Sequence, residues 1–123
     1  MNYSGVIIEE SLTDKTVLKD VIIISTEVEP ITPEHKTPWL KQWTLHNVEV
    51  PEANAEQIVD KISKALESER TSWYADFKND DYHYIIFPNK VFKVDRTNPV
   101  LYKDAREYGI SLGIPEYQVD FHP

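Results

Sequence analysis

The sequence contains no cysteine, and this absence excludes several kinds of chemistry at once. A chain without thiols forms no disulfide, binds no metal through thiolates and has no cysteine nucleophile. The 123 residues fit one domain, 1–123, in which folding buries about two-thirds of the surface, enough for a core without a covalent staple. We therefore expect a single domain from a reducing compartment and predict a cytoplasmic protein.

Glycine is almost as scarce, with only Gly5, Gly109 and Gly113 in the chain. Neither a phosphate-binding loop nor a dinucleotide-binding turn forms without its spaced glycines, and no Gly-x-Ser-x-Gly nucleophile elbow occurs. The four histidines stand 11, 37 and 39 positions apart, so no helix carries two of them at the spacing of a zinc site. The sequence predicts no cofactor and no metal.

Basic residues are also in short supply, since 13 Lys and Arg face 21 Asp and Glu and the net charge is −8. Nucleic acids and anionic membrane surfaces are both bound by basic side chains, so neither is expected as a partner. The longest apolar run, residues 21–24, is far too short to cross a bilayer. The first ten residues lack the basic and apolar regions of a signal peptide, and we expect a soluble protein.

The first half of the chain predicts mainly strands. Residues 6–8 and 21–28 are β-branched runs, joined over 11–20 by a turn with a short helix. Three prolines within residues 29–38 remove backbone donors and indicate an ordered surface loop. Residues 42–50 then form a strand rich in aromatic and β-branched side chains.

Two helices are predicted by their caps and their apolar periodicity. Asn54 begins the first helix, with Gln57 at the position of a capping-box partner. The second begins with Asn98 as cap and Pro99 as first helical residue, and Gly113 closes it in the left-handed conformation. The expected apolar stripes are Ile58, Val59, Ile62, Ala65 and Leu66 in the first helix, and Leu101, Ala105, Tyr108 and Leu112 in the second.

Short strands are predicted between and after the helices, over residues 72–78, 82–87, 90–95 and 117–121. From residue 42 the order is β-α-β-β-β-α-β, which becomes a split βαβ pattern if the strands around Pro88 act as one unit. We predict an α+β fold with a mainly antiparallel sheet and two helices on one face. A ferredoxin-like core would span about residues 42–121, with an N-terminal strand extension and a partly open second face.

Three segments carry a resemblance to a known family. Residues 73–77 read WYADF, residues 86–94 read IFPNKVFKV and residues 108–121 read YGISLGIPEYQVDF. Together they resemble a small family of conserved bacterial proteins to which no function is assigned. The resemblance covers about residues 40–121 and implies a bacterial cytosolic protein with one intact domain. It implies no activity, cofactor or catalytic residue.

A polar set on one sheet face is the first candidate site. Tyr74 and Asp76 share one side of their strand, and a carboxylate there could bind a small polar ligand or act as a general base. His46 and Lys90 complete this candidate ligand-binding set. We favour a structural interpretation, in which Asp76 pairs across strands with Lys90 or Tyr84. By the same interpretation His46 is buried and hydrogen-bonded.

An acidic cluster is the second candidate, because Asp76, Asp80, Asp81 and His83 fall within eight residues around a predicted hairpin. One interpretation is a site for a hard metal ion at the end of the sheet. The favoured interpretation is a turn held by side-chain-to-backbone hydrogen bonds, with His83 pointing outward.

Two tryptophans at the exit of the proline-rich loop, Trp39 and Trp43, are candidates for partner binding, because Trp is enriched in binding hot spots. Burial in the core accounts for them equally well. Since no catalytic signature is assembled, the favoured function is a non-enzymatic protein-binding or self-associating module, a homodimer included. The alternative is a small-ligand-binding protein or modest enzyme with a site on the open sheet face.

Overall fold

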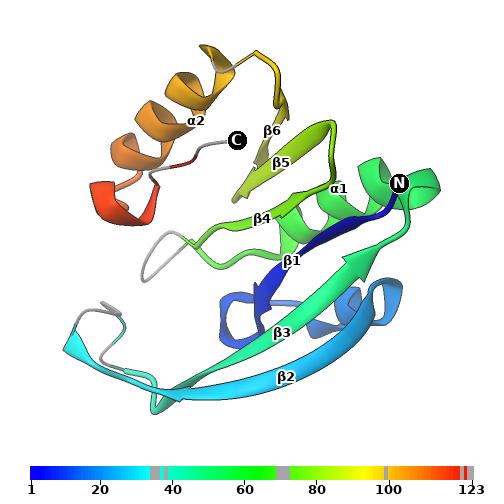
Figure 1. The fold of residues 1–123 in the computed structure, drawn as a ribbon. Coiled ribbons are helices and arrows are strands. Elements are labelled where there is room, and N and C mark those ends of the chain that lie inside the picture. The colour runs from blue at the N-terminus through cyan, green and yellow to red at the C-terminus, as the bar shows by residue number, and fades with distance from the viewer. Residues whose placement is uncertain (34–36, 38, 69–72, 99, 120, 122–123) are drawn as a thin grey trace.

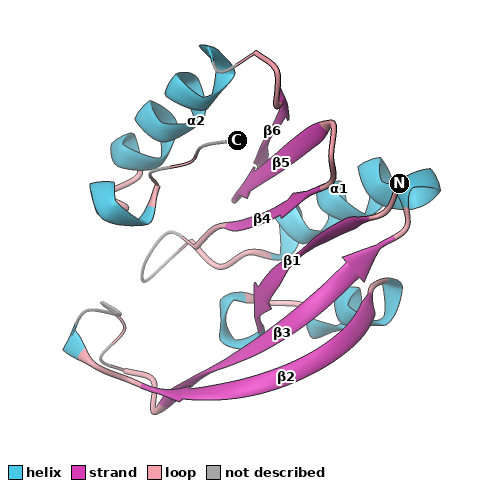
Figure 2. Ribbon diagram, viewed as in Figure 1, coloured by secondary structure: helices cyan, strands magenta, loops and turns pink. Residues whose placement is uncertain are grey.

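A six-stranded antiparallel sheet forms the centre of the protein (Figure 1, Figure 2). The computed structural model describes residues 1–33, 37, 39–68, 73–98, 100–119 and 121. Its regular elements are strands β1 Tyr3–Ile8, β2 Ile22–Pro30, β3 Gln42–Val50, β4 Ala75–Lys78, β5 Tyr82–Phe87 and β6 Lys90–Asp95, and helices α1 Ala55–Ala65 and α2 Val100–Ser111. The strand order is β2-β3-β1-β4-β5-β6, and every neighbouring pair is antiparallel.

The predicted strands of the first half are confirmed, and two of them are longer than predicted. β1 begins at Tyr3, three residues before its predicted start. β2 continues to Pro30 and so reaches into the proline-rich segment that was expected to be a loop. Residues 34–36 and 38 of that segment lie outside the described residues, as do residues 69–72 before β4. The short helix expected over 11–20 is present as a 3-10 helix, η2 Lys15–Asp20, after a single 3-10 turn, η1 Glu9–Ser11.

β5 is buried on both of its sides, and this divides the core in two. Tyr84 and Ile86 point to the face where they pack with α1, and we call it the α1 face. Ile85 and Phe87 point to the opposite face, where they pack with α2, and we call it the α2 face. A strand that is apolar at successive positions needs cover on both sides.

The two helices therefore lie on opposite faces of the sheet, not on one face as predicted (Figure 1). The α+β class and the antiparallel sheet are confirmed. The sequence of β5, Tyr-His-Tyr-Ile-Ile-Phe, carries the physical reason, because it gives each face a row of side chains to bury. The α2 face is covered only in part, since α2 packs over β5 and β6 and, in the described residues, no helix packs on the β2-β3-β1 part of this face.

α1 buries the predicted apolar stripe, including Leu66 just after its last turn. The predicted capping box is wrong, because the side chain of Asn54 makes no capping hydrogen bond. Asn54 is instead the last residue of a 3-10 turn, η4 Glu52–Asn54, and its backbone N–H donates to the carbonyl of Pro51 at 3.1 Å. The chain therefore enters α1 directly from a 3-10 turn, and the residue at the N-cap position, Asn54, is the last residue of that turn.

α2 begins as predicted, because the backbone N–H of Val100 donates to the Asn98 side chain at 3.4 Å. Pro99 lies outside the described residues. Gly113 closes the helix with a φ of +87°, as expected. The apolar stripe differs, since Leu101 is 38 % exposed while Tyr102 turns into the core. No helix in the described ranges is long and apolar enough to cross a membrane.

The predicted last strand over residues 117–121 is not formed in the described part of that segment. Residues Glu116–Gln118 form a 3-10 turn, η5, in which the N–H of Gln118 donates to Pro115 at 2.9 Å. The N–H of Val119 donates to Glu116 at 3.2 Å, so these donors are satisfied within the segment and not by the sheet. Without this strand the βαβ pattern stays incomplete, and the ferredoxin-like core is not confirmed.

Candidate functional site

The predicted polar set is divided between the two faces of the sheet. His46 is paired with Ile7 of β1, and Asp76 is paired with Val6, the preceding residue. Successive residues of a strand point to opposite faces, so His46 lies on the α1 face and Asp76 on the α2 face. The structure does not bring these two groups together, and they cannot share one proton-transfer site.

Tyr74 and Lys90 make contacts that tie the fold together. The Tyr74 hydroxyl donates to the backbone carbonyl of Gln118, and its ring lies edge-on to Phe121 with centroids 5.4 Å apart. Burial, and to a smaller extent the nearby Asp76, raises the pKa of Tyr74 to about 12. The exposed Lys90 places Nζ 5.2 Å from the centroid of the Phe92 ring. In these contacts neither Tyr74 nor Lys90 forms a hydrogen bond or an ion pair with Asp76.

Asp76 is bonded instead to His83, whose Nε2 lies 2.7 Å from Asp76 Oδ2. The other ring nitrogen, Nδ1, lies 2.9 Å from the hydroxyl of Tyr102 on α2. The His83 side chain is buried, with 3 % exposed, so the expectation that it points outward is wrong. The prediction treats His83 as part of the turn. His83 instead belongs to β5, where alternation puts its side chain on the same face as Ile85 and Phe87, under α2. We call Asp76, His83 and Tyr102 the inner triad.

A second histidine has the same arrangement on the opposite face. His46 Nδ1 lies 2.8 Å from Thr26 Oγ1 of β2, and its Nε2 lies 3.1 Å from Glu9 Oε1 of η1. The His46 side chain is 9 % exposed, whereas Thr26 lies on the surface. The prediction of a buried, hydrogen-bonded histidine matches this geometry. We call Glu9, His46 and Thr26 the outer triad.

One tautomer satisfies every group in each triad. If Nε2–H donates to the carboxylate, Nδ1 accepts from the hydroxyl, and no proton is shared or missing. The ring is then held between an acid and an alcohol in the order that general-base activation of a hydroxyl requires. In the inner triad this hydroxyl is buried, and burial raises the pKa of Tyr102 while Arg96 opposes the shift. In the outer triad the hydroxyl belongs to an exposed residue, Thr26.

The acidic cluster around the β4–β5 hairpin forms the predicted turn. The Asn79 side chain accepts from the backbone N–H groups of Asp81 and Tyr82 at 2.9 and 2.8 Å. Within the described ranges, no three His, Asp or Glu side chains are placed to hold a metal ion. These contacts support the structural interpretation of the cluster.

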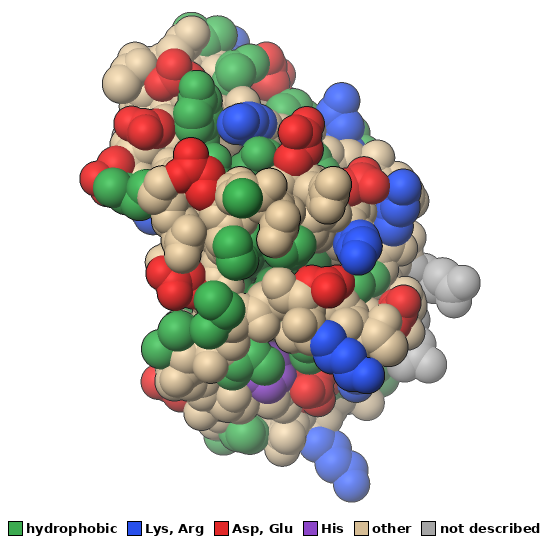
Figure 3. All heavy atoms as spheres, turned by 90° about the vertical axis from the view of Figure 1, so that its right-hand side faces the viewer, with side chains coloured by type: hydrophobic (Ala, Val, Ile, Leu, Met, Phe, Trp, Pro, Cys, Tyr) green, Lys and Arg blue, Asp and Glu red, His purple; other side chains and the backbone are tan. Residues whose placement is uncertain are grey.

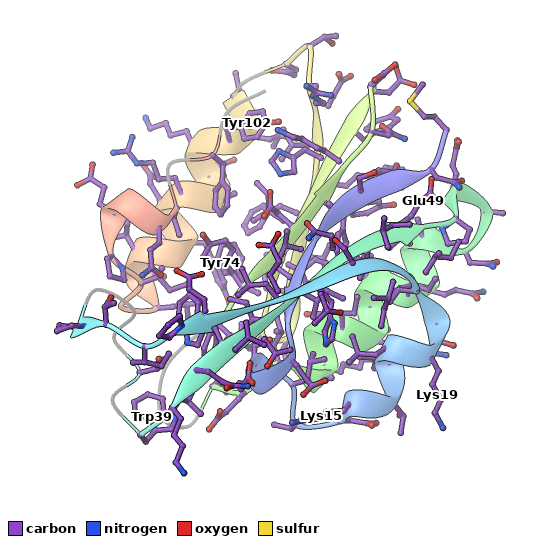
Figure 4. The ribbon with its side chains drawn as sticks, turned by 60° about the horizontal axis from the view of Figure 1, so that its bottom comes forward. Lys15, Lys19, Trp39, Glu49, Tyr74 and Tyr102 are labelled. Carbon is purple, nitrogen blue, oxygen red and sulfur yellow. The ribbon has the colours of Figure 1, made fainter. Side chains whose placement is uncertain are left out.

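The two candidate tryptophans have different environments. Trp43 packs against the core with its ring centroid 5.3 Å from that of Trp73, and its Nε1 donates to Thr37 Oγ1 at 2.9 Å. Trp39 is 37 % exposed and lies beyond the end of the β2-β3 ribbon (Figure 4). Trp43 is partly buried and has a structural role, and Trp39 is the more exposed of the two.

β2 is an exposed strand that forms one edge of the sheet. All nine of its residues are exposed. Its apolar side chains include a run of three isoleucines and are among the most exposed in the described chain: Ile22 46 %, Ile23 44 %, Ile24 65 % and Val28 59 %. Figure 3 shows hydrophobic side chains reaching the surface beside acidic ones over one half of its view, with most Lys and Arg over the other half.

The register of β2 assigns its side chains to the two faces. Thr26 faces His46 on the α1 face, and Ile23 and Val28 share that face. Ser25 and Asn47 are bonded at 2.9 Å on the α2 face, which Glu27 and Glu29 share. The pairing shifts between Ile23 and Ser25, so Ile24 is the extra residue of a β-bulge.

No protein-family model, curated protein or solved structure matches this chain. The resemblance to conserved bacterial proteins therefore stays a prediction. Function has to be argued from the two triads and from the exposed edge of β2.

Sequence reasoning missed Thr26, Glu9 and Tyr102. Glu9 and Thr26 are 37 and 20 positions from His46, and no local spacing signals that they converge. Tyr102 had a weak signal, because it follows the exposed Leu101 in a helix whose buried side also carries Ala105 and Gly109. Starting the predicted apolar stripe at Tyr102 instead of Leu101 would have placed Tyr102 on the buried side of the helix.

Proposed function

We propose that this protein is a non-enzymatic binding module that accepts an extended segment of another protein along the edge of β2, in the cytoplasm of a bacterium. The absence of cysteine and the family resemblance support the location. The interaction surface differs from the one expected, because Trp43 is committed to the core. β2 takes the place of the two tryptophans as the main contact surface.

The observation that carries the proposal is the exposure of every residue of β2 at the edge of the sheet. An edge strand presents unpaired backbone N–H and C=O groups, and an extended segment can add to the sheet by pairing with them. Sheets commonly protect such edges with short strands, prolines, charged side chains or bulges. β2 has two glutamates and a bulge, but it is nine residues long, has proline only at its end and contains no lysine.

The side chains of β2 add affinity to this backbone pairing. Covering exposed isoleucine and valine side chains removes apolar surface from water, at about 25 cal/mol for each Å². The bulge at Ile24 gives the edge a local shape that a bound segment has to match.

The test is a selection of displayed peptides of about ten residues, the length of a long strand. Enriched peptides should bind the wild-type protein and lose binding to Ile23→Lys/Val28→Lys, which replaces two exposed side chains on one face of β2. A matched control, Val100→Lys/Ile110→Lys, changes two exposed side chains of α2 and should bind normally. Equal binding to both double variants, with both folded by circular dichroism, would contradict the proposal.

The outer triad supports a second candidate function, the cleavage of activated esters. The distances of 2.8 and 3.1 Å lie within the range of a nucleophile, its base and the group that orients the base. In this reaction Thr26 Oγ1 attacks the ester carbonyl, and its proton passes to His46 Nδ1. The alcohol leaves with that proton, and water then releases the acid from Thr26.

This second candidate is tested with p-nitrophenyl acetate. Release of p-nitrophenol should be lost in Thr26→Val, which removes the hydroxyl but keeps the β-branched shape. Thr44→Val is the matched control, because Thr44 lies on the adjacent strand and donates to Glu10, not to a histidine. Equal rates for both variants and the wild type would exclude Thr26 as a nucleophile.

A further inference from the structure

Two neighbouring hydroxyls, those of Ser25 and Thr26, stand in the middle of β2, and both residues are exposed. Each hydroxyl makes one hydrogen bond across to β3. On the α2 face the Asn47 amide donates to Ser25 Oγ at 2.9 Å. On the α1 face Thr26 Oγ1 lies 2.8 Å from His46 Nδ1. We call Ser25 and Thr26 the hydroxyl pair.

These existing bonds decide what each hydroxyl can still offer to a bound segment. The Glu9 carboxylate only accepts, so His46 Nε2 carries the proton in the neutral ring and Nδ1 accepts from Thr26. Thr26 therefore offers lone pairs alone. Ser25 accepts from Asn47, and in the described part of the chain no other group accepts the proton of Ser25. Thr26 can thus bind a donor on the α1 face, and Ser25 an acceptor on the α2 face.

A strand added beside β2 would cover both hydroxyls. It would lie about 4.8 Å away, and its successive side chains point to opposite faces, so two neighbouring residues would face Ser25 and Thr26. Apolar side chains there would remove the bonds of the hydroxyls to water without replacing them. Asn and Gln have both donors and an acceptor, so an amide satisfies either hydroxyl. The pair of Asn47 and Ser25 shows that an amide bridges two neighbouring strands of this sheet.

We infer that the segment bound along β2 carries two successive amide side chains, Asn or Gln, opposite Ser25 and Thr26. Apolar residues on either side of the two amides cover Ile24 and Val28. This inference rests on the proposed function and names the chemistry of the partner. Because each amide both donates and accepts, the pattern fits parallel and antiparallel addition alike.

Charge does not distinguish the two sides of this edge, but it disfavours two other occupants. An acidic segment would face carboxylates on either side, and like charges across a strand pair are destabilising. A second copy of the chain carries a net charge of −8 and has no amide side chain in its own β2. The carboxylates are Glu27, Glu29 and Glu49 on the α2 side and Glu9, Glu10, Asp14 and Asp20 on the α1 side, where Lys15, Lys19 and Lys61 also lie.

The test compares two peptides of about ten residues by calorimetry. Both have flanks of alternating Thr and Val, and their centres are Asn–Asn and Leu–Leu, which are similar in shape. The Asn–Asn peptide should bind about tenfold more tightly, because only its side chains replace the bonds that the hydroxyl pair makes to water. Ser25→Ala/Thr26→Val should abolish this preference. The control Ser4→Ala/Thr44→Val makes the same two changes on the inner strands β1 and β3 and should retain it.

A second variant is needed because Thr26→Val also removes a hydrogen bond within the fold. Ser25→Ala alone leaves the bond between Thr26 and His46 in place. It should reduce the preference to about threefold, since one of the two hydroxyls remains. A full tenfold preference in both variants would show that the amides are recognised elsewhere, and would overturn the inference.

The other outcomes separate the inference from the proposed function. Equal binding of the two peptides, or tighter binding of Leu–Leu, lost in Ile23→Lys/Val28→Lys, would overturn the amide preference and leave docking at β2 intact. Binding that survives Ile23→Lys/Val28→Lys would place the contact elsewhere and overturn both. If neither peptide binds, the inference is overturned, and the display selection decides the proposed function separately. A dimer formed through β2 that excludes both peptides would also overturn the inference, in favour of self-association.

Discussion

The hydroxyl of Thr26, an exposed residue, lies 2.8 Å from Nδ1 of the buried His46. This contact joins the edge strand to its neighbour, and through His46 Nε2 it reaches Glu9 before η2. A side chain on the proposed binding edge is thus connected to the buried side of the sheet. The stability of β2 can be tested through this one hydroxyl.

Thr26→Val should destabilise the protein by about 1–2 kcal/mol, because His46 Nδ1 is left buried without a donor. The substitution keeps the β-branched shape, so packing and strand propensity change little. Thr26→Ser retains the hydroxyl and is the control, with a smaller loss expected. Urea unfolding of the three proteins gives the comparison, and equal midpoints would contradict the role assigned to this hydrogen bond.

Tyr102→Phe should destabilise the protein by about 1–3 kcal/mol, because it removes the hydroxyl 2.9 Å from buried His83 Nδ1. The inner triad joins α2 to β4 and β5, so losing this hydrogen bond should also weaken the packing of α2 on the sheet. Tyr82→Phe removes a hydroxyl from a tyrosine that is 38 % exposed and should change stability little. If both variants unfold at the same urea concentration, the inner triad does not stabilise the fold.

Gly5→Ala should destabilise the β1–β4 pair by at least about 2 kcal/mol, the cost of forcing an added methyl group into a packed site. A Cβ at position 5 would lie 2.2 Å from the backbone oxygen of Asp76 and 2.3 Å from Cδ1 of Phe77. The backbone of β4 therefore has to move, and with it Asp76. Ser4→Ala, at the exposed neighbouring position, is the control. Wild-type stability of Gly5→Ala would show that the strands are not this close.

Tyr74→Phe tests a stability contribution that depends on pH. At neutral pH it should cost about 1 kcal/mol, because the hydrogen bond to Gln118 is lost. The pKa of Tyr74 is raised from 10.0 in the unfolded chain to about 12, so folding favours the neutral hydroxyl. That contribution is complete below pH 10 and is lost as the pH rises through 12.

The difference in unfolding free energy between the wild type and Tyr74→Phe should therefore narrow between about pH 10 and 12. Urea unfolding at several pH values measures this difference. Absorbance of the tyrosinate ion gives an independent check, since the variant should lack one late-titrating group. A difference that stays constant across this range would contradict the burial of Tyr74.

Much of the fold could be predicted because its signals are local. The alternation around Phe77 and the helical stripe around Ile62 are read from neighbouring residues, and both are buried as expected. The prediction of the last strand was wrong because the backbone N–H of Val119 donates to the carbonyl of Glu116 in a turn. Nothing in the residue types distinguishes that turn from a short strand.

The candidate site could be predicted only in part, because it depends on pairing between distant segments. Which histidine meets which carboxylate follows from strand order and register. β1 lies between β3 and β4, and His46 is paired with Ile7 while Asp76 is paired with Val6, which places the two side chains on opposite faces. Likewise, β-branched runs predicted the strand over 21–28, but not that it forms an edge. Edge position is a property of the whole sheet and not of the strand.

Residue-resolved amide hydrogen exchange of β2 tests the central claim most directly. In an edge strand every second N–H points away from its neighbour, so alternate amides of β2 should exchange fast and the others slowly. Adding a peptide enriched on the wild-type protein should slow the fast set alone, while β6 and α2 remain unchanged. Uniform protection of β2 in the free protein, or peptide-induced protection elsewhere with none in β2, would contradict its role as a binding edge.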